Sequence, residues 1–260
     1  MMTGVLVLYS LSLVFNLISW KIRRKFCVAV ESFFLMAGWG FHSYLIVKRA
    51  IEAQRFPLTD TYETLIVFAW LVVILSFLTS VRFGFRGIRL LGIIATLCLL
   101  TFSLFINDAV QPLMPSLRSG WLYFHVGAYI IAYASFAIAF GLGIVFISIF
   151  LANRGKQKAI LDSIEGMIFR VIDLGFPFLT VGLACGSIWA SLSWGRFWNW
   201  DAKEVWALTT WLIYAGCLHL RHTRNLRGVN AALMSLIGFI VILFTYIGVN
   251  LFFPTLHSYS

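Results

Sequence analysis

The residues with the clearest chemical potential in this chain are tryptophans gathered near position 200. The segment from Trp194 to Glu204 reads Trp-Gly-Arg-Phe-Trp-Asn-Trp-Asp-Ala-Lys-Glu, and six of the ten tryptophans lie between residues 189 and 211. Indole rings offer a broad area for stacking, and Arg196 or Lys203 can pair with carboxylates. This combination suits a flat, apolar ligand with acidic edges.

Two interpretations fit this tryptophan-rich loop. Tryptophan is favoured at membrane–water interfaces, so the loop can be an aromatic belt. Belts place one or two aromatic residues at each helix end, whereas here three tryptophans lie within the loop and alternate with polar residues. The second interpretation is a platform for haem or another planar cofactor, formed by Trp194, Gly195, Arg196, Trp198, Trp200, Asp201 and Glu204.

The composition indicates that helices in a membrane position these residues. Of 260 residues, 61% are hydrophobic and 12% are charged, and the mean hydropathy is +0.91. A hydrocarbon core of about 30 Å needs roughly 20 apolar residues per helix. Residues 152–167 carry apolar positions at helical spacing, which predicts a segment along the inner membrane surface. We predict an all-α polytopic membrane protein, a single transmembrane domain over 1–260, with about eight spans at 4–20, 26–47, 64–81, 87–106, 121–151, 169–190, 204–220 and 229–253.

The charged residues predict how the chain crosses the membrane. Fourteen lysines and arginines fall in one set of alternate loops and six in the other, so the positive-inside rule places both termini on the extracytoplasmic side. The net charge of +10 is divided into short clusters between apolar spans, which argues against a nucleic-acid partner. The four cysteines lie within apolar spans and form no C-x-x-C pair, so we expect no thiol chemistry from them.

The histidines can be sorted by their depth in the predicted spans, because two axial ligands of one iron must lie at the same depth. His125 lies about 6 Å into its span from the outer end, and His257 follows the last span, so both are level with the tryptophan-rich loop. His219 lies about 22 Å deeper, and this distance excludes a shared iron with His125. His42 is also at the outer level, where a second-shell role is possible. Hydrogen bonding to a neighbouring helix is the alternative for any of them.

The chain resembles the CcsA-type (ResC-like) membrane subunit of the system II cytochrome c synthase. The tryptophan-rich loop by itself, known as the WWD motif, is shared with a wider group of haem-handling proteins of CcmC and CcmF type. Ala202 is a departure, because the family more often has proline there. The resemblance covers most of the chain and is carried by Phe56-Pro57, Tyr62-Glu63, Pro112 to Pro115, Trp121 to His125, Gly175 to Pro177, Trp194 to Glu204, His219 to Arg221, Gly248 to Asn250 and Leu256 to Tyr259.

This resemblance implies a function in cytochrome c biogenesis. The protein would transport haem b to the extracytoplasmic face and, as part of a cytochrome c haem lyase (holocytochrome c synthase), present it to the C-x-x-C-H motif of apocytochrome c. His125 and His257 would be the axial ligands of the external haem, and His219 one ligand of a haem within the membrane. No predicted loop is long enough to fold as a soluble domain, and the family's CcsB/ResB-type partner supplies one.

The implied location is the bacterial cytoplasmic membrane or the thylakoid membrane. Two other functions stay open at this stage. One is a haem exporter or CcmC-like delivery subunit without a role in attachment. The other is an ion or solute transporter with an aromatic outer gate, which would bind no haem.

Overall fold

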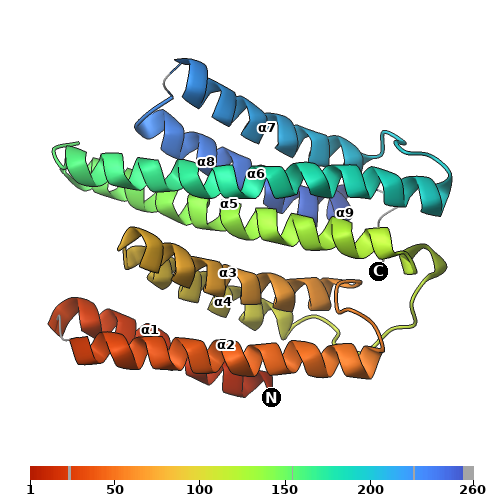
Figure 1. Ribbon diagram of the computed structural model, residues 1–260, viewed down its shortest axis with the longest axis horizontal. Coiled ribbons are helices and arrows are strands. Elements are labelled where there is room, and N and C mark those ends of the chain that lie inside the picture. The colour runs from red at the N-terminus through yellow and green to blue at the C-terminus, as the bar shows by residue number, and fades with distance from the viewer. Residues whose placement is uncertain (23–24, 154, 225, 254–260) are drawn as a thin grey trace. The chain divides into compact units, whose positions relative to one another are not determined.

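Helices account for the regular structure of this chain in a computed structural model, which describes residues 1–22, 25–153, 155–224 and 226–253 (Figure 1). No strand occurs among these residues. The chain also has a 3₁₀ turn at Pro115–Leu117 and a π turn at Phe244–Gly248. The helices are α1 (Met2–Ile22), α2 (Lys25–Ala53), α3 (Thr61–Phe83), α4 (Gly87–Ser103), α5 (Gly120–Asn153), α6 (Lys158–Trp194), α7 (Ala202–Arg224), α8 (Val229–Leu243) and α9 (Val249–Phe252).

The prediction of an all-α polytopic membrane protein is confirmed. Among the residues that the structure describes, five helical stretches are long and apolar enough to cross a membrane: Met2–Ile22, Thr61–Phe83, Gly120–Ala152, Lys158–Trp194 and Val229–Gly248. The other predicted spans fall on α2, α4 and α7, of which α4 is apolar but has only 17 residues. The count of eight crossings and the extracytoplasmic termini stay predictions.

Most of the segment predicted to lie along the inner membrane surface, residues 158–167, is instead the first part of α6. This helix begins at Lys158 and has 37 residues, so it is about 55 Å long, well beyond the roughly 30 Å of a hydrocarbon core. Its first turns bury Leu161, Ile164 and Met167, each at most 6% exposed. The periodicity predicts a membrane-facing stripe here, but these residues pack against the protein.

The chain divides into two compact units, Met1–Leu113 and Met114–Ser260. In the first unit, α1 packs on α2 and α4, and α3 packs on α4 and α2 (Figure 1). In the second unit, α5 lies along α6, α8 packs on α5, and α7 contacts both α6 and α8. The single-domain prediction over 1–260 stays a prediction.

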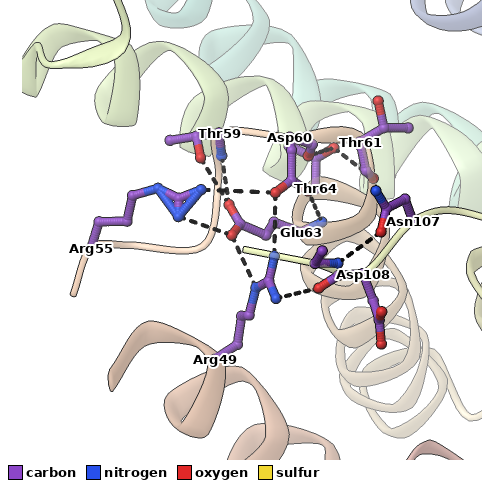
Figure 2. Close-up of polar contacts among 10 residues, drawn as sticks. Arg49, Arg55, Thr59, Asp60, Thr61, Glu63, Thr64, Asn107 and Asp108 are labelled. Carbon is purple, nitrogen blue, oxygen red and sulfur yellow. Dashed lines mark hydrogen bonds and ion pairs between the residues drawn. The ribbon is translucent and has the colours of Figure 1, made fainter. Parts of the chain in front are cut away.

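Glu63 is the centre of a buried polar cluster in the first unit (Figure 2). Its side chain is 0% exposed, and its Oε1 accepts from Arg49 Nε at 3.1 Å and Arg55 Nη1 at 3.3 Å. Its Oε2 accepts from the backbone N–H and the hydroxyl of Thr59, at 3.1 and 3.0 Å. Arg49 also donates to the carbonyl oxygen of Asp108 at 2.5 Å. The cluster therefore ties α2 and α3 to the two connecting segments nearby.

Asp60 begins α3 as its N-cap, and its Oδ1 accepts from the backbone N–H of Glu63 at 2.7 Å. Burial raises the pKa of Asp60, and the nearby Glu63 carboxylate raises it further. The backbone N–H of Glu63 and the charge of Arg49 act in the opposite direction. The loop before α3 is thus fixed by a helix cap and by two arginines.

A second polar cluster lies in the second unit, where α7 ends and α8 begins. Glu165 of α6 accepts from Arg221 of α7 at 2.6 Å and from the backbone N–H of Gly228, before α8, also at 2.6 Å. The Arg221 guanidinium lies 4.4 Å from the ring centroid of Phe169. Since one carboxylate joins three helices here, it holds the ends of α7 and α8 against α6.

Candidate functional site

The interface of α5 and α6 positions His125. Glycines on α6 allow the aromatic side chains of α5 to approach closely, because a Cβ there would collide with them. A Cβ at Gly186 would lie 2.5 Å from Nδ1 of His125, and one at Gly182 would lie 2.7 Å from the Tyr129 ring. Contacts shorter than 3 Å require the neighbour to move, so these glycines define the space that the imidazole occupies.

A carbonyl oxygen fixes the tautomer of His125. Its Nδ1 lies 2.7 Å from the carbonyl oxygen of Gly182. Because a carbonyl can only accept, the proton belongs on Nδ1, and the lone pair of the neutral ring is then on Nε2. A backbone carbonyl at the far nitrogen is the usual orienting contact of an iron- or zinc-binding histidine.

Trp189 connects His125 to the tryptophan-rich loop. Its ring stacks on the imidazole with centroids 5.9 Å apart and an interplanar angle of 23°, and Trp194 meets the Trp189 ring edge-on with centroids 4.9 Å apart. Trp189 is 2% exposed, and its Nε1 donates to the carbonyl oxygen of Ser116 at 2.9 Å. Sequence reasoning did not place Trp189 in the site. A signal existed, since Gly182, Gly186 and Trp189 share one face of a helix at i, i+4 and i+7.

The loop keeps its shape through glycine and two carboxylates. Gly195 ends α6 in the left-handed conformation, with φ of 76°, and its N–H donates to Ser191 O at 2.9 Å. Asp201 Oδ1 accepts from the backbone N–H of Glu204 at 2.8 Å, and Glu204 Oε2 accepts from that of Asn199 at 2.7 Å. This reciprocal arrangement resembles a capping box at the start of α7. Asp201 and Glu204, predicted as haem-loop residues, therefore have structural contacts of their own.

The aromatic surface of the loop is open. Trp200 is 73% exposed and Phe197 is 63% exposed, and Trp198 meets Trp200 edge-on at 6.0 Å. The indole N–H of Trp198 and the amide nitrogen of Asn199 are buried and have no hydrogen-bond partner in the described part of the chain. Two such donors beside exposed indole rings fit a flat ligand with acceptor groups.

The other predicted histidines lie apart from this group. His219 is exposed near the carboxyl end of α7, and its ring makes no hydrogen bond or ring contact with the residues that the structure describes. His42 is fully buried in the first unit, where its Nδ1 lies 3.4 Å from the Tyr9 hydroxyl. His257 is outside the described residues. The structure thus brings together His125, Trp189, Trp194 and the loop, and keeps His219 at the opposite end of the second unit.

Comparisons with known proteins identify the family of this chain. The family model of the cytochrome c assembly protein matches residues 58–257. A protein of Chlamydomonas reinhardtii named cytochrome c biogenesis protein CcsA is 37% identical over 226 residues, which cover 83% of this chain but only 64% of that relative. Proteins of the same name from Guillardia theta and Synechococcus elongatus are each 30% identical, and the alignments cover 98% and 83% of this chain and 91% and 82% of the relatives. The chain therefore belongs to the cytochrome c assembly protein family.

Proposed function

We propose that this chain moves haem to the extracytoplasmic face of its membrane and presents it there for covalent attachment to apocytochrome c. The observation that carries the proposal is the fixed imidazole of His125. Its Nδ1 is held by the Gly182 carbonyl, and its ring stacks on Trp189, which continues into Trp194 and the exposed indoles of the loop. A ligand nitrogen beside a flat apolar surface is what haem binding requires.

Each part of the proposed site has a physical role. The loop tryptophans offer stacking area for the macrocycle, and Arg196 offers a charge for its carboxylates. His125 and His257 would bind the iron of this haem substrate from its two faces, which limits access of oxygen to the metal. His219 would bind haem deeper in the membrane with a second ligand from a CcsB/ResB-type partner, before haem passes to the outer loop.

The attachment step uses groups that the substrates bring. Each thiol of the apocytochrome C-x-x-C-H motif adds across a vinyl group of haem b, so that sulfur bonds to one carbon and the proton goes to the other. No oxidant or reductant is consumed. The chain's contribution as a haem lyase subunit would be to hold haem in position for this addition. The partner would hold the apocytochrome, in a bacterial cytoplasmic or thylakoid membrane.

Visible absorption spectra of the purified complex with its partner test this assignment. The double variant His125→Ala/His257→Ala is expected to lose the spectrum of the external haem and to attach no haem to apocytochrome. His222→Ala is a matched control, because it removes an exposed imidazole at the other end of α7. Full haem content and full attachment in the double variant would exclude these two ligands.

A haem-delivery subunit without a role in attachment predicts the same spectra. The reconstituted pair and a C-x-x-C-H peptide separate the two functions, since attachment that requires this chain supports the synthase function. A transporter of other solutes would give no haem spectrum in either experiment.

A further inference from the structure

A pocket of about 390 Å³ opens beside the proposed haem site in the second unit. One wall is the turn that leads into α5, and the other is the last part of α6. Its lining has one cation, three hydroxyl groups and no carboxylate, contributed by Pro115, Ser116, Arg118, Ser119, Leu192 and Ser193. The amino end of α5, a helix of 34 residues, adds the positive end of its dipole. The pocket therefore favours an anion.

Arg118 is available for such an anion. Its guanidinium forms no hydrogen bond or ion pair with another residue in the described ranges. Two other arginines of this chain are neutralised within the protein, Arg49 by Glu63 and Arg221 by Glu165. An arginine is well suited to a carboxylate, which it can bind through two parallel hydrogen bonds.

The pocket adjoins the haem site through a shared wall. The carbonyl oxygen of Ser116 accepts from Trp189 Nε1 at 2.9 Å and from the Ser193 hydroxyl at 3.2 Å. Trp189 is also the ring that stacks on His125. The same tryptophan therefore lies between the anion-favouring pocket and the proposed iron ligand, within one group of packed side chains.

We propose that this pocket binds one propionate carboxylate of haem while the macrocycle lies on the tryptophan-rich loop. Haem carries two propionates, and Arg196 of the loop is a second arginine that has no ion-pair partner among the described residues. The pocket would fix the rotation of haem about the iron–histidine axis, and so determine which edge carries the vinyl groups toward the apocytochrome. This inference rests on the proposed function.

Titration of the complex with haem and with haem dimethyl ester tests the pocket, because the ester lacks both carboxylate charges. We expect Arg118→Ala to weaken haem binding about tenfold, the usual effect of one charge-assisted hydrogen bond, and to leave ester binding unchanged. Arg118→Lys should restore part of the difference, since it keeps the charge without the paired donors. Lys48→Ala is the matched control, as it removes a half-buried basic side chain of the first unit that pairs with Glu52.

The comparison of haem with its dimethyl ester also separates a loss of the carboxylate contact from a loss of folding. Unchanged ester binding shows that the Arg118→Ala site is intact, whereas equal weakening of haem and ester would overturn the proposal. Equal haem and ester affinities in the unaltered complex would overturn it as well. An anionic lipid is the other source of a matching group. If Arg118→Ala lowered retention of phosphatidylglycerol in mixed vesicles and left the haem-to-ester ratio unchanged, the pocket would be a lipid site. Absence of any haem spectrum in the unaltered complex would instead contradict the proposed function.

Discussion

The tautomer and position of the His125 imidazole depend on a backbone carbonyl and on a glycine that leaves room for the ring. The carbonyl of Gly182 sets the tautomer, and Gly186 leaves the space that the ring fills. Both residues are in direct contact with the imidazole of His125. Trp189 adds a stacked ring and is anchored to Ser116. The orientation of one proposed ligand therefore depends on three residues of α6.

The substitution Gly186→Ala should displace the His125 imidazole and leave the fold intact. The added Cβ would lie 2.5 Å from Nδ1 of His125, so the ring must turn away from the Gly182 carbonyl. Loss of an orienting contact typically lowers the affinity of a metal site by about 10- to 100-fold. We expect haem titration of Gly186→Ala, followed by the visible spectrum, to show a loss of this size.

Gly166→Ala provides the control for this prediction, because it lies on the same helix and an added Cβ meets no atom within 4 Å. Its haem binding should equal that of the unaltered chain. If Gly186→Ala bound haem with unchanged affinity, Gly186 would have no positioning role.

Two helices begin with the same Asp-x-x-Glu capping motif. Asp60 and Glu63 begin α3, and Asp201 and Glu204 begin α7. In each pair the aspartate accepts from the backbone N–H of the glutamate, and the glutamate accepts from a backbone N–H before the helix. This capping motif fixes the loop against the start of the helix that follows the loop. In α3 it is reinforced by two arginines, and in α7 the fixed loop is the one that carries the tryptophans.

Glu204 variants test whether this carboxylate is structural. Glu204→Ala removes the acceptor for the Asn199 N–H and should destabilise the start of α7 by about 1 kcal/mol. Glu204→Gln keeps an acceptor oxygen, so haem titration should show binding close to that of the unaltered chain. Equal loss of haem binding in both variants would show that the negative charge itself is needed.

The second unit separates two proposed haem positions along its length. His125 lies near the amino end of α5, at the end of the unit that carries the tryptophan-rich loop. His219 lies near the carboxyl end of α7, two residues before the Arg221 that is held by Glu165. A transport function needs this separation, because haem must be bound at one depth and released at another. The match to the cytochrome c assembly family extends from residue 58 to 257 and so includes both positions.

His219→Ala should therefore lower the supply of haem to the complex and leave haem binding at the outer site unchanged. We expect cells that produce the variant to yield complex with little haem, measured as pyridine haemochrome. Haem added to the purified variant from outside should still bind and give the spectrum of the His125/His257 site. If added haem did not bind either, the two histidines would not act at separate positions.

The sequence by itself determined the helices and the tryptophan-rich loop. Lipid offers no hydrogen bonds to the backbone, so apolar runs of about 20 residues must become helices. The start of α6 was the exception, because its apolar face packs on protein rather than on lipid.

Only the tertiary structure decided how the helices are rotated against one another. His125 meets Gly182 57 residues later in the chain, and Glu165 meets Arg221 after 56. The pocket at Arg118 likewise joins residues near 116 to residues near 193. Such pairs depend on which faces of two helices come together, and that is fixed by the packing of many side chains at once. Local periodicity shows which face of a helix is small or aromatic, but it does not identify the residue that lies opposite.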